Sequence, residues 1–398
     1  MPTVLQINIG TRKSTGTIAE SINRIAAKNG WEIYFAYGRS VGPCESKLIH
    51  IGNKLTQAIA LMESRLFDRD GLSSRLATRL LVKEIKKIKP DIIHLHNLHG
   101  YYINYKILFQ YLNYTEIPVV WTLHDCWAFT GHCSHFAFAQ CERWKTGCYQ
   151  CPQKKVYPKS LWIDRSKQNY ELKKKLFTAK SRMHIVVVSQ WLANLAKQSF
   201  LKDQSIHIIN NGIDLNVFKP IPHEEHSKYN VLGVASVWGK GKGLFDFYKL
   251  YEMLDPEQYT ITLIGLSEAQ IRELPSGING LQRTNSVQEL ALQYSNANVF
   301  VNPTYADSFP TTNLEALACG TPVVMYRTDG SPEAIDERTG VVVDQGDIDG
   351  LASAVVEICK QGKSQFEDAC RNRAKSFFNR EERFMDYLKL YNVIRENR

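Results

Sequence analysis

The stretch NPTYADSFPTTNLEALACGTPVV, residues 302–324, decides how the second half of this chain folds. It begins at the end of an apolar run and continues into a loop of polar and turn-forming residues. Thr311 or Thr312 can cap the helix that follows. That helix carries Glu315 in its first turn and stops at Gly320, directly before a second apolar run. Strand, loop, helix and strand in this order predict one unit of a parallel α/β sheet.

The same alternation runs through the whole chain. Helix-like spacing of apolar residues, as at residues 17–28 and 75–89, separates apolar runs of strand length. These runs lie at residues 4–9, 33–37, 91–96, 118–123, 184–188, 229–235, 260–264, 299–302, 322–326 and 341–343. Helix-sized connections require parallel sheets with helices on both faces. We therefore predict an α/β fold of two doubly wound, Rossmann-like domains.

The length of 398 residues also favours two domains, and the pattern pauses near Asn211-Gly212 and two prolines. The predicted parts are an N-terminal domain at 1–206, a connector at 207–222, a C-terminal domain at 223–378 and a helix at 379–398 that packs back on the N-terminal domain. Ligands of such sheets bind beyond the carboxyl ends of the strands. Two sheets facing each other would place a cleft between the domains.

Composition is that of an ordinary globular protein, with 44% hydrophobic and 22% charged residues. No apolar run approaches the roughly 18 residues of a membrane span, and the chain starts with a strand rather than a signal segment. We therefore expect a cytoplasmic protein. Residues 1–180 contain 27 Lys and Arg against 13 Asp and Glu. This basic half indicates an anionic partner, either a phosphate-bearing substrate or an acidic membrane face, or is merely a solvated surface.

The quoted stretch resembles the signature of the family 4 retaining glycosyltransferases, which have the GT-B architecture. In that family two acidic residues eight positions apart flank a Phe-containing loop and lead into Glu-Ala-Leu-Ala-x-Gly-x-Pro-Val-Val. The pair here is Asp307 and Glu315, with Asp where the family has Glu and Pro310 where it has Gly. The resemblance implies that Glu315 holds the ribose of a nucleotide-sugar. It also implies that Asp307 and the residues after it contact the donor sugar and phosphates, namely Ser308, Phe309 and Thr311.

A second segment, GVASVWGKGKG at residues 233–243, follows the first strand of the second domain. Glycines allow close backbone approach and lysine supplies charge for a diphosphate, although such a turn is often only a surface turn. In the family an Arg shortly precedes a Lys-Gly pair here, and both cations contact the donor phosphates. Lys242 matches the lysine, and Lys240 is the candidate to replace the missing arginine.

Two candidates lie in the first domain. Gly16 closes the loop GTRKSTG at residues 10–16, where the family has a glycine-rich loop at the substrate site. His124 ends the strand at 118–123, where the family carries a His close to the donor sugar, although a lone His is more often a packing residue. Of two histidines on an earlier strand end, we expect His96 to lie nearer the cleft and one to pack beneath the site.

Five of the nine cysteines fall in a predicted insertion at residues 126–160. Cys-x-x-Cys has metal-ligand spacing, and a loop of this length is costly to order without a staple. The candidate zinc ligands are Cys133, Cys141, Cys148 and Cys151, with His132 and His135 as substitutes. The alternative is reduced thiols packed among aromatic rings. The insertion resembles that of bacterial polysaccharide-assembly transferases with the same Cys-x-x-Cys-Pro pattern, and the metal we predict is structural.

The sequence shows no nucleophile with a positioned base. The resemblance implies metal-independent, retaining transfer in which the leaving diphosphate accepts the proton, with His124, Asp307 and Lys242 as catalytic residues. A saccharide or lipid-linked saccharide of a bacterial capsule or O-antigen is the expected acceptor, and the basic stretch at 75–89 could rest on an anionic membrane. The alternatives are a sugar-nucleotide epimerase and a zinc-stapled nucleic-acid-binding protein. Because no basic-aromatic recognition motif is present, we expect no nucleic acid partner.

Overall fold

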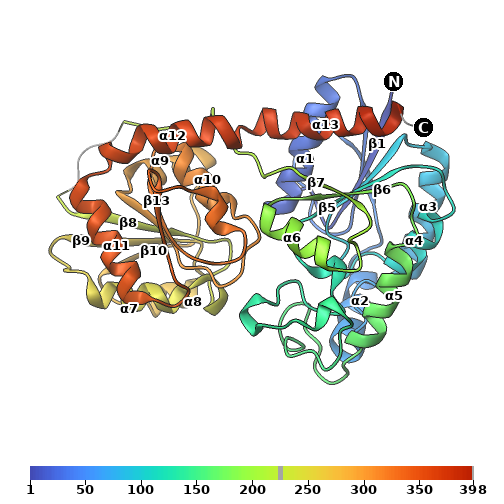
Figure 1. Ribbon diagram of the computed structural model, residues 1–398, viewed down its shortest axis with the longest axis horizontal. Helices are drawn as coiled ribbons and strands as arrows, with labels where there is room; N and C mark the ends of the chain where they lie inside the picture. The colour runs from blue at the N-terminus through green and yellow to red at the C-terminus, as the bar shows by residue number, and fades with distance from the viewer. Residues whose placement is uncertain (223–226, 397–398) are drawn as a thin grey trace. The chain divides into compact units, whose positions relative to one another are not determined.

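The computed structural model describes residues 1–222 and 227–396. The chain forms two compact units, the first comprising Met1–Asn210 with Phe384–Arg398 and the second comprising Asn211–Arg383 (Figure 1). Residues 223 and 398, which bound two of the predicted segments, lie outside the described residues. Residues 207 and 208, predicted as connector, belong to a strand of the first unit.

The first unit contains a seven-stranded sheet in which every recorded strand pair is parallel. In sheet order its strands are β3 (Lys47–His50), β2 (Glu32–Tyr37), β1 (Thr3–Asn8), β4 (Ile92–Leu95), β5 (Val119–Leu123), β6 (Met183–Val187) and β7 (Ser205–Ile208). All residues of the central strands β1, β4 and β5 are buried. Strands covered on both faces require such continuous apolar runs.

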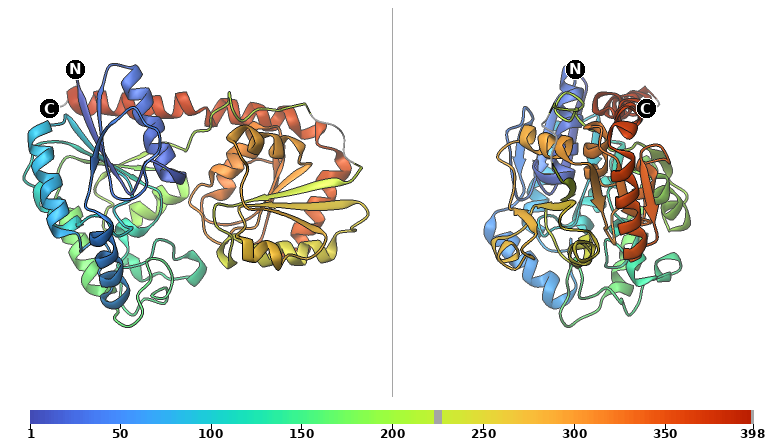
Figure 2. Two further views of the ribbon diagram at one scale, coloured as in Figure 1. Left: turned by 180° about the vertical axis from the view of Figure 1, so that it is seen from behind. Right: turned by 90° about the vertical axis from the view of Figure 1, so that its left-hand side faces the viewer.

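Helices cover both faces of this sheet (Figures 1 and 2). They are α1 (Lys13–Lys28), α2 (Lys54–Phe67), α3 (Arg75–Ile88), α4 (Tyr105–Leu112), α5 (Ser166–Phe177), α6 (Gln190–Gln198) and the end of α13 (Arg380–Glu396). Tyr387 and Tyr391 of α13 join α1 in one buried cluster against the sheet. The hydroxyl of Tyr391 lies 2.5 Å from Nδ1 of His94, so the histidine beneath the strand ends is a packing residue.

The second unit contains a six-stranded parallel sheet. Its strands in sheet order are β10 (Ile278–Leu281), β9 (Tyr259–Ile264), β8 (Tyr229–Val234), β11 (Val299–Asn302), β12 (Val323–Tyr326) and β13 (Gly340–Val343). Its helices are α7 (Leu244–Met253), α8 (Glu268–Arg272), α9 (Val287–Asn296), α10 (Thr311–Ala318), α11 (Ile348–Gln361), α12 (Ser364–Phe378) and the start of α13. Two parallel, helix-covered sheets confirm the predicted α/β class.

The predicted insertion connects β5 to α5 without a regular helix or strand among its described residues. It contains only the single-turn 3-10 helices η1 (Trp127–Phe129), η2 (Ala137–Ala139) and η3 (Arg143–Lys145). Stacked rings of Phe136 and Trp144, with centroids 4.9 Å apart, give it a small core of its own. None of the helices in the described part of the chain is long and apolar enough to span a membrane.

Candidate active site

Two loops of the second unit meet at the carboxyl ends of the adjacent strands β8 and β11. The N–H of Tyr305 donates to the carbonyl oxygen of Gly241 at 3.0 Å. Gly243 has a φ of 73°, and a Cβ there would lie 2.3 Å from the carbonyl oxygen of Pro303. Only glycine allows both this backbone conformation and this approach, so it holds the two loops in contact.

Contact between the loops pairs two of the predicted catalytic residues. Nζ of Lys242 lies 2.6 Å from Oδ2 of Asp307, and the side chains are 36% and 25% exposed. Asp307 is held in turn, because its N–H donates to Asp329 at 3.1 Å and its Oδ1 accepts from the N–H of Phe309 at 3.3 Å. The ammonium is thus fixed at the strand ends, where an anionic ligand can compete with the carboxylate for it.

Helix α10 starts directly after the second of these loops. Its N-cap is Pro310 and no side chain caps it, so the prediction that Thr311 or Thr312 serves as the N-cap is wrong. The helix end agrees with the sequence, because Gly320 follows it with a φ of 75°. An uncapped helix start presents backbone N–H groups and partial positive charge, which favour a phosphate.

Glu315 lies in the second turn of α10 and not in the first, because Thr311 is the first helical residue. The helix dipole therefore explains little of its position, since that effect is confined to the first turn. The hydroxyl of Tyr294 donates to Oε2 of Glu315 at 2.9 Å. Burial raises the pKa of Glu315 to about 7, although hydrogen bonds from Tyr294 and Thr311 oppose the shift. Such a carboxylate is costly for the fold, which makes Glu315 a candidate for ligand binding.

The other predicted donor contacts differ in how they are placed. Ser308 is buried, and its hydroxyl has no hydrogen-bond partner among the described residues. Thr311 is half-buried, and its side chain is hydrogen-bonded to the carboxylate of Glu315. Phe309 packs on Phe378 with ring centroids 5.8 Å apart, so its ring belongs to the core of this unit. Lys240 is exposed at the start of the 3-10 helix η4 (Lys240–Lys242), which precedes α7.

In the first unit His124 follows β5 and contacts His96, which follows β4. Nε2 of His96 lies 2.9 Å from Oε1 of Gln6, and Nδ1 of His96 lies 3.1 Å from Nε2 of His124. Since an amide oxygen only accepts, His96 donates to Gln6 and accepts from His124, which leaves Nδ1 of His124 as an acceptor. Burial lowers the pKa of His124 to about 4. At neutral pH this ring can accept a hydrogen bond from a sugar hydroxyl.

Gly16 lies outside the loop to which the sequence assigned it. Helix α1 begins at Lys13, which makes Gly16 its fourth residue. A Cβ at this position would lie 2.7 Å from the carbonyl oxygen of Gly10. The residue is therefore small because the loop backbone packs directly on the helix. This observation explains the glycine by packing, without a phosphate.

A buried ion pair beside His124 was not predicted from the sequence. Nε2 of His99 lies 2.9 Å from Oδ2 of Asp125, and Nδ1 of His99 lies 2.9 Å from the hydroxyl of Tyr157. Burial disfavours both charges, but their attraction outweighs it, lowering the pKa of Asp125 to about 2 and raising that of His99. The only sign of this ion pair in the sequence was Asp125, which stands directly after His124 at the end of β5. Tyr157 comes from the insertion, and no spacing rule connects it to His99.

The four predicted zinc ligands line one small pocket in the insertion, together with the aromatic rings of Phe136, Trp144 and Tyr149. All are free thiols. The N–H of Gly131 donates to Sγ of Cys148 at 3.1 Å, and the thiols of Cys133 and Cys151 are hydrogen-bonded to each other. In residues 1–222 and 227–396 no three His, Cys, Asp or Glu side chains form a group that could hold a metal ion. The thiols share a pocket without converging on one point.

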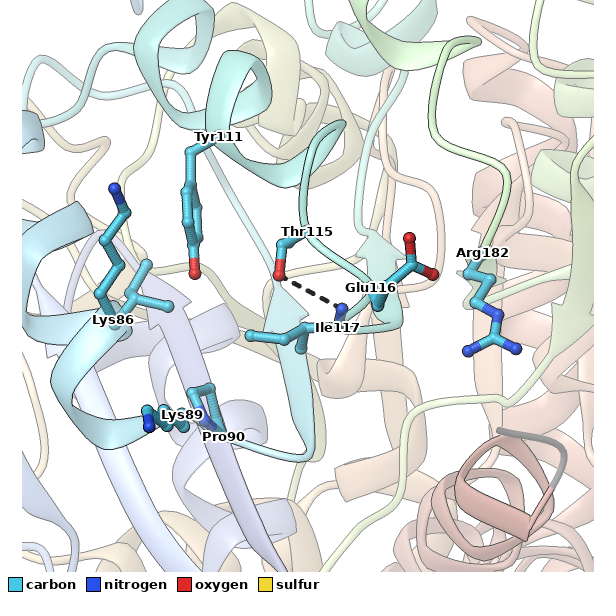
Figure 3. Close-up of a pocket in the computed structure, with 9 residues that line it drawn as sticks. Lys86, Lys89, Pro90, Tyr111, Thr115, Glu116, Ile117 and Arg182 are labelled. Atoms are coloured by element: carbon cyan, nitrogen blue, oxygen red, sulfur yellow. Dashed lines mark hydrogen bonds between the residues drawn. The ribbon is translucent and has the colours of Figure 1, made fainter.

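A pocket of about 570 Å³ lies away from all these residues, at the amino ends of strands in the first unit (Figure 3). Pro90, Ile117 and Arg182, which line it, each come just before a strand. Lys86 and Lys89 of the α3 end also line it. None of the predicted site residues does. Because ligands of doubly wound sheets bind at the carboxyl ends of strands, we do not assign the donor to this pocket.

Both halves of the chain match models of glycosyltransferase families. Residues 24–217 match the model described as Glycosyltransferase Family 4, and residues 228–361 match the one described as Glycosyl transferases group 1. Among solved structures, sucrose-phosphate synthase from Thermosynechococcus elongatus superposes with a TM-score of 0.76 at 16% identity, covering 100% of both chains. Anabaena HepE in complex with UDP gives a TM-score of 0.67 at 14% identity, covering 99% of this chain and 100% of that one.

Curated relatives carry transferase names as well. The Escherichia coli protein named putative colanic acid biosynthesis glycosyl transferase WcaC is 27% identical over 87% of this chain and 88% of its own length. A Campylobacter jejuni protein named N,N'-diacetylbacillosaminyl-diphospho-undecaprenol alpha-1,3-N-acetylgalactosaminyltransferase is 27% identical over 53% of this chain and 61% of its own length. With the two parallel sheets and the family models that match both halves, the chain belongs to the family 4 glycosyltransferases of GT-B fold.

Proposed function

We propose that this glycosyltransferase is a retaining enzyme that transfers a sugar from a UDP- or GDP-sugar to a saccharide or lipid-linked saccharide. Its pathway would be the assembly of a bacterial surface polysaccharide such as a capsule or O-antigen. Support for the pathway comes from the names of the E. coli and C. jejuni relatives. The observation that carries the proposal is the half-buried carboxylate of Glu315 on α10, which accepts a hydrogen bond from Tyr294 and whose pKa burial raises to about 7.

The donor would be held by the second unit. Glu315 would accept hydrogen bonds from both ribose hydroxyls, since a carboxylate has two oxygens for a vicinal diol. The diphosphate would lie between Lys242 and the uncapped start of α10, with Lys240 as an outer cation and the Ser308 hydroxyl as a donor. The carboxylate of Asp307 would then lose its contact with Lys242 and accept a hydrogen bond from a hydroxyl of the donor sugar. Each of these groups carries charge or a hydrogen-bonding atom that suits the ligand.

Transfer would depend on positioning and charge stabilisation rather than on a protein nucleophile. The acceptor hydroxyl would arrive on the face from which the diphosphate departs, and a phosphate oxygen would take its proton. Lys242 and the amides of α10 would stabilise the growing negative charge of that leaving group. Neutral His124 would accept a hydrogen bond from a sugar hydroxyl through Nδ1, with His96 fixing its orientation.

Turnover is expected to persist in the presence of EDTA and without added magnesium, because fixed cations and amides take the role of a metal at the diphosphate. Release of UDP or GDP from a panel of nucleotide-sugars, followed by chromatography of the sugar, measures it. An epimerised sugar would favour the epimerase alternative, and no response to any donor would favour a binding protein. Strict dependence on Mg²⁺ or Mn²⁺ would contradict the metal-independent mechanism.

We also propose that Cys133, Cys141, Cys148 and Cys151 hold a structural zinc ion. Four thiolates are a common ligand set for structural zinc, and a single metal would offset the cost of ordering an insertion without regular elements. The hydrogen bond that the N–H of Gly131 donates to Cys148 would stabilise the thiolate of this cysteine. The thiols of Cys133 and Cys151 would give up the hydrogen bond between them and bind the zinc ion instead. His132 stays a suitable substitute, because Asp68 holds its Nδ1 at 2.5 Å and its buried Nε2 has no hydrogen-bond partner among the described residues.

About one zinc ion per chain is expected from elemental analysis of the protein purified under reducing conditions. Cys148→Ser should lose the metal and melt at a lower temperature. Cys44→Ser should keep it, because Cys44 is a free thiol outside the pocket. A protein that neither carries zinc nor takes up zinc or cobalt after reconstitution would show that the cysteines are packing residues.

The partners follow from the proposed reaction. They are a nucleotide-sugar, a saccharide or lipid-linked acceptor and, for a lipid-linked acceptor, the anionic inner face of the plasma membrane. The proposed compartment is the cytoplasmic side of that membrane. We propose no nucleic acid partner, because the groups at the strand ends suit one nucleotide-sugar and the chain offers no basic-aromatic recognition motif.

A further inference from the structure

An exposed apolar stripe runs along α2 in the first unit. Leu55, Ile59 and Met62 are 68%, 46% and 59% exposed. Their spacing of four and three residues places them on one face of the helix. Single exposed apolar residues are ordinary, but a continuous apolar face marks an interaction site.

The segment that joins the insertion to α5 extends this face. Leu161, Trp162 and Ile163 are consecutive and 40%, 73% and 42% exposed. The N–H of Leu161 donates to the carbonyl oxygen of Arg65 on α2 at 2.7 Å, so the two segments adjoin. Figures 1 and 2 show the insertion beside α2 from opposite sides. The six apolar residues of these two segments are called the docking surface below.

Cations lie on the same two segments as the docking surface. The exposed ones on α2 and at residues 154–163 are Lys54, Arg65, Lys155 and Lys159. Two neighbouring carboxylates are already engaged, Glu63 with the hydroxyl of Ser73 at 2.9 Å and Asp164 with the N–H of Ser166 at 2.8 Å. An apolar face with a rim of cations and an exposed tryptophan is complementary to anionic lipid, where the cations meet phosphates and the ring lies at headgroup depth.

The same charges disfavour a second copy of the chain as the occupant. In a two-fold dimer each surface faces itself, so Lys54, Arg65, Lys155 and Lys159 would all face like charges. Repulsion between such groups would offset much of the gain from burying the apolar stripe. An anionic surface turns each of these cations into an attraction instead.

The docking surface is linked to the strand ends that carry His124. The hydroxyl of Tyr101, which follows β4, is hydrogen-bonded to Ser64 of α2. Tyr157 of the insertion is bonded to His99, which also follows β4. A lipid surface bound here would therefore lie on the side of this unit where the strands have their carboxyl ends and where His124 is placed.

We propose that the docking surface binds the anionic lipid surface of a membrane. Its use in capturing a lipid-linked acceptor rests on the proposed function, whereas lipid binding itself does not. This assignment moves the membrane contact from residues 75–89, which the sequence indicated, to α2 and the insertion. Helix α3 exposes Leu76 and Leu80 but no aromatic residue.

Flotation with vesicles of phosphatidylcholine, with and without phosphatidylglycerol, tests the proposal. The wild-type chain should float only with the anionic vesicles, and added salt should reduce its binding. Ile59→Asp combined with Trp162→Ala should weaken vesicle affinity about 100-fold. Tyr114→Ala is the matched control, because Tyr114 is an aromatic residue 90% exposed at the other end of the strands.

Donor hydrolysis without acceptor, together with the melting temperature, shows whether each variant is folded and separates this test from that of the proposed function. Equal flotation of wild type and double variant would overturn the proposal, as would absence of flotation for an active wild type. A dimer that the double variant disrupts, in place of lipid binding, would identify the surface as a contact between copies.

Discussion

Glu315→Gln is expected to lower kcat/KM for the nucleotide-sugar by about 10²- to 10³-fold, with a similar loss in affinity for free UDP or GDP. Glutamine keeps the size of the side chain but removes the charge that would strengthen both proposed hydrogen bonds to the ribose diol. Bonds to a charged group contribute about 1.5–3 kcal/mol each, so losing most of two bonds accounts for this magnitude. Initial rates and calorimetric titration with the nucleotide measure the two effects.

The wild-type enzyme should depend on pH in a way that the variant does not. Since burial raises the pKa of Glu315 to about 7, the carboxyl group of Glu315 in the free enzyme is largely protonated below pH 7. Nucleotide affinity should therefore fall as the pH decreases through about 7, whereas the affinity of Glu315→Gln should stay nearly constant. Glu289→Gln, at a half-buried carboxylate on the neighbouring helix α9 that is bonded to Asn285, is the control. An unchanged kcat/KM for Glu315→Gln would contradict the ribose assignment.

The same substitution is expected to stabilise the protein at alkaline pH. In the folded chain Glu315 keeps its proton up to about pH 7, whereas the ordinary pKa of a glutamate, which applies to the unfolded chain, is 4.5. Between these values the folded state binds more protons, so the free energy of unfolding decreases as pH rises. Above about pH 7 the full penalty, roughly 1–3 kcal/mol, is present. The variant should thus melt at a higher temperature than wild type above pH 7, and the difference should vanish toward pH 4.5.

Lys242→Met is expected to lower kcat by about 10²- to 10³-fold, because in the proposed mechanism the ammonium stabilises charge that grows on the leaving diphosphate. Methionine preserves much of the side-chain volume and removes only the cation. Lys249→Met is the matched control, since Lys249 is exposed on α7, the helix that follows the same loop. Single-turnover rates of donor cleavage measure the chemical step directly.

The ion pair with Asp307 adds a second arm to this experiment. If the diphosphate replaces the carboxylate at Lys242, Asp307→Asn should cost less nucleotide affinity than Lys242→Met, because it frees the cation while removing only a sugar contact. A change confined to KM in Lys242→Met, with kcat preserved, would show that the lysine binds the ground state and transition state equally. That result would remove it from the catalytic set.

Central strands were predictable from the sequence and most edge strands were not. The runs at 118–123 and 322–326 differ from β5 and β12 by a single residue, because strands buried on both faces must be apolar throughout. The strands β3, β7 and β10, which were missed, all lie at sheet edges. Most of their residues are exposed or half-exposed, so selection for apolar side chains is weak there.

The sequence named Lys242 and Asp307 as separate candidates and did not predict their contact. Both residues follow strands, and a doubly wound sheet brings such strand ends together. The partner of Glu315, Tyr294, lies on a different helix and has no pattern of its own. The cap of α10 was misassigned because a threonine after proline satisfies the capping rule locally, while the helix had already begun.

Soaking or co-crystallising the protein with UDP and with GDP tests the central claim most directly. The account predicts both ribose hydroxyls at about 3 Å from the carboxylate of Glu315, with the diphosphate at Lys242 and the first amides of α10. Nucleotide bound elsewhere, for example in the pocket of Lys86, Lys89 and Arg182, with Glu315 bonded only to Tyr294, would contradict it.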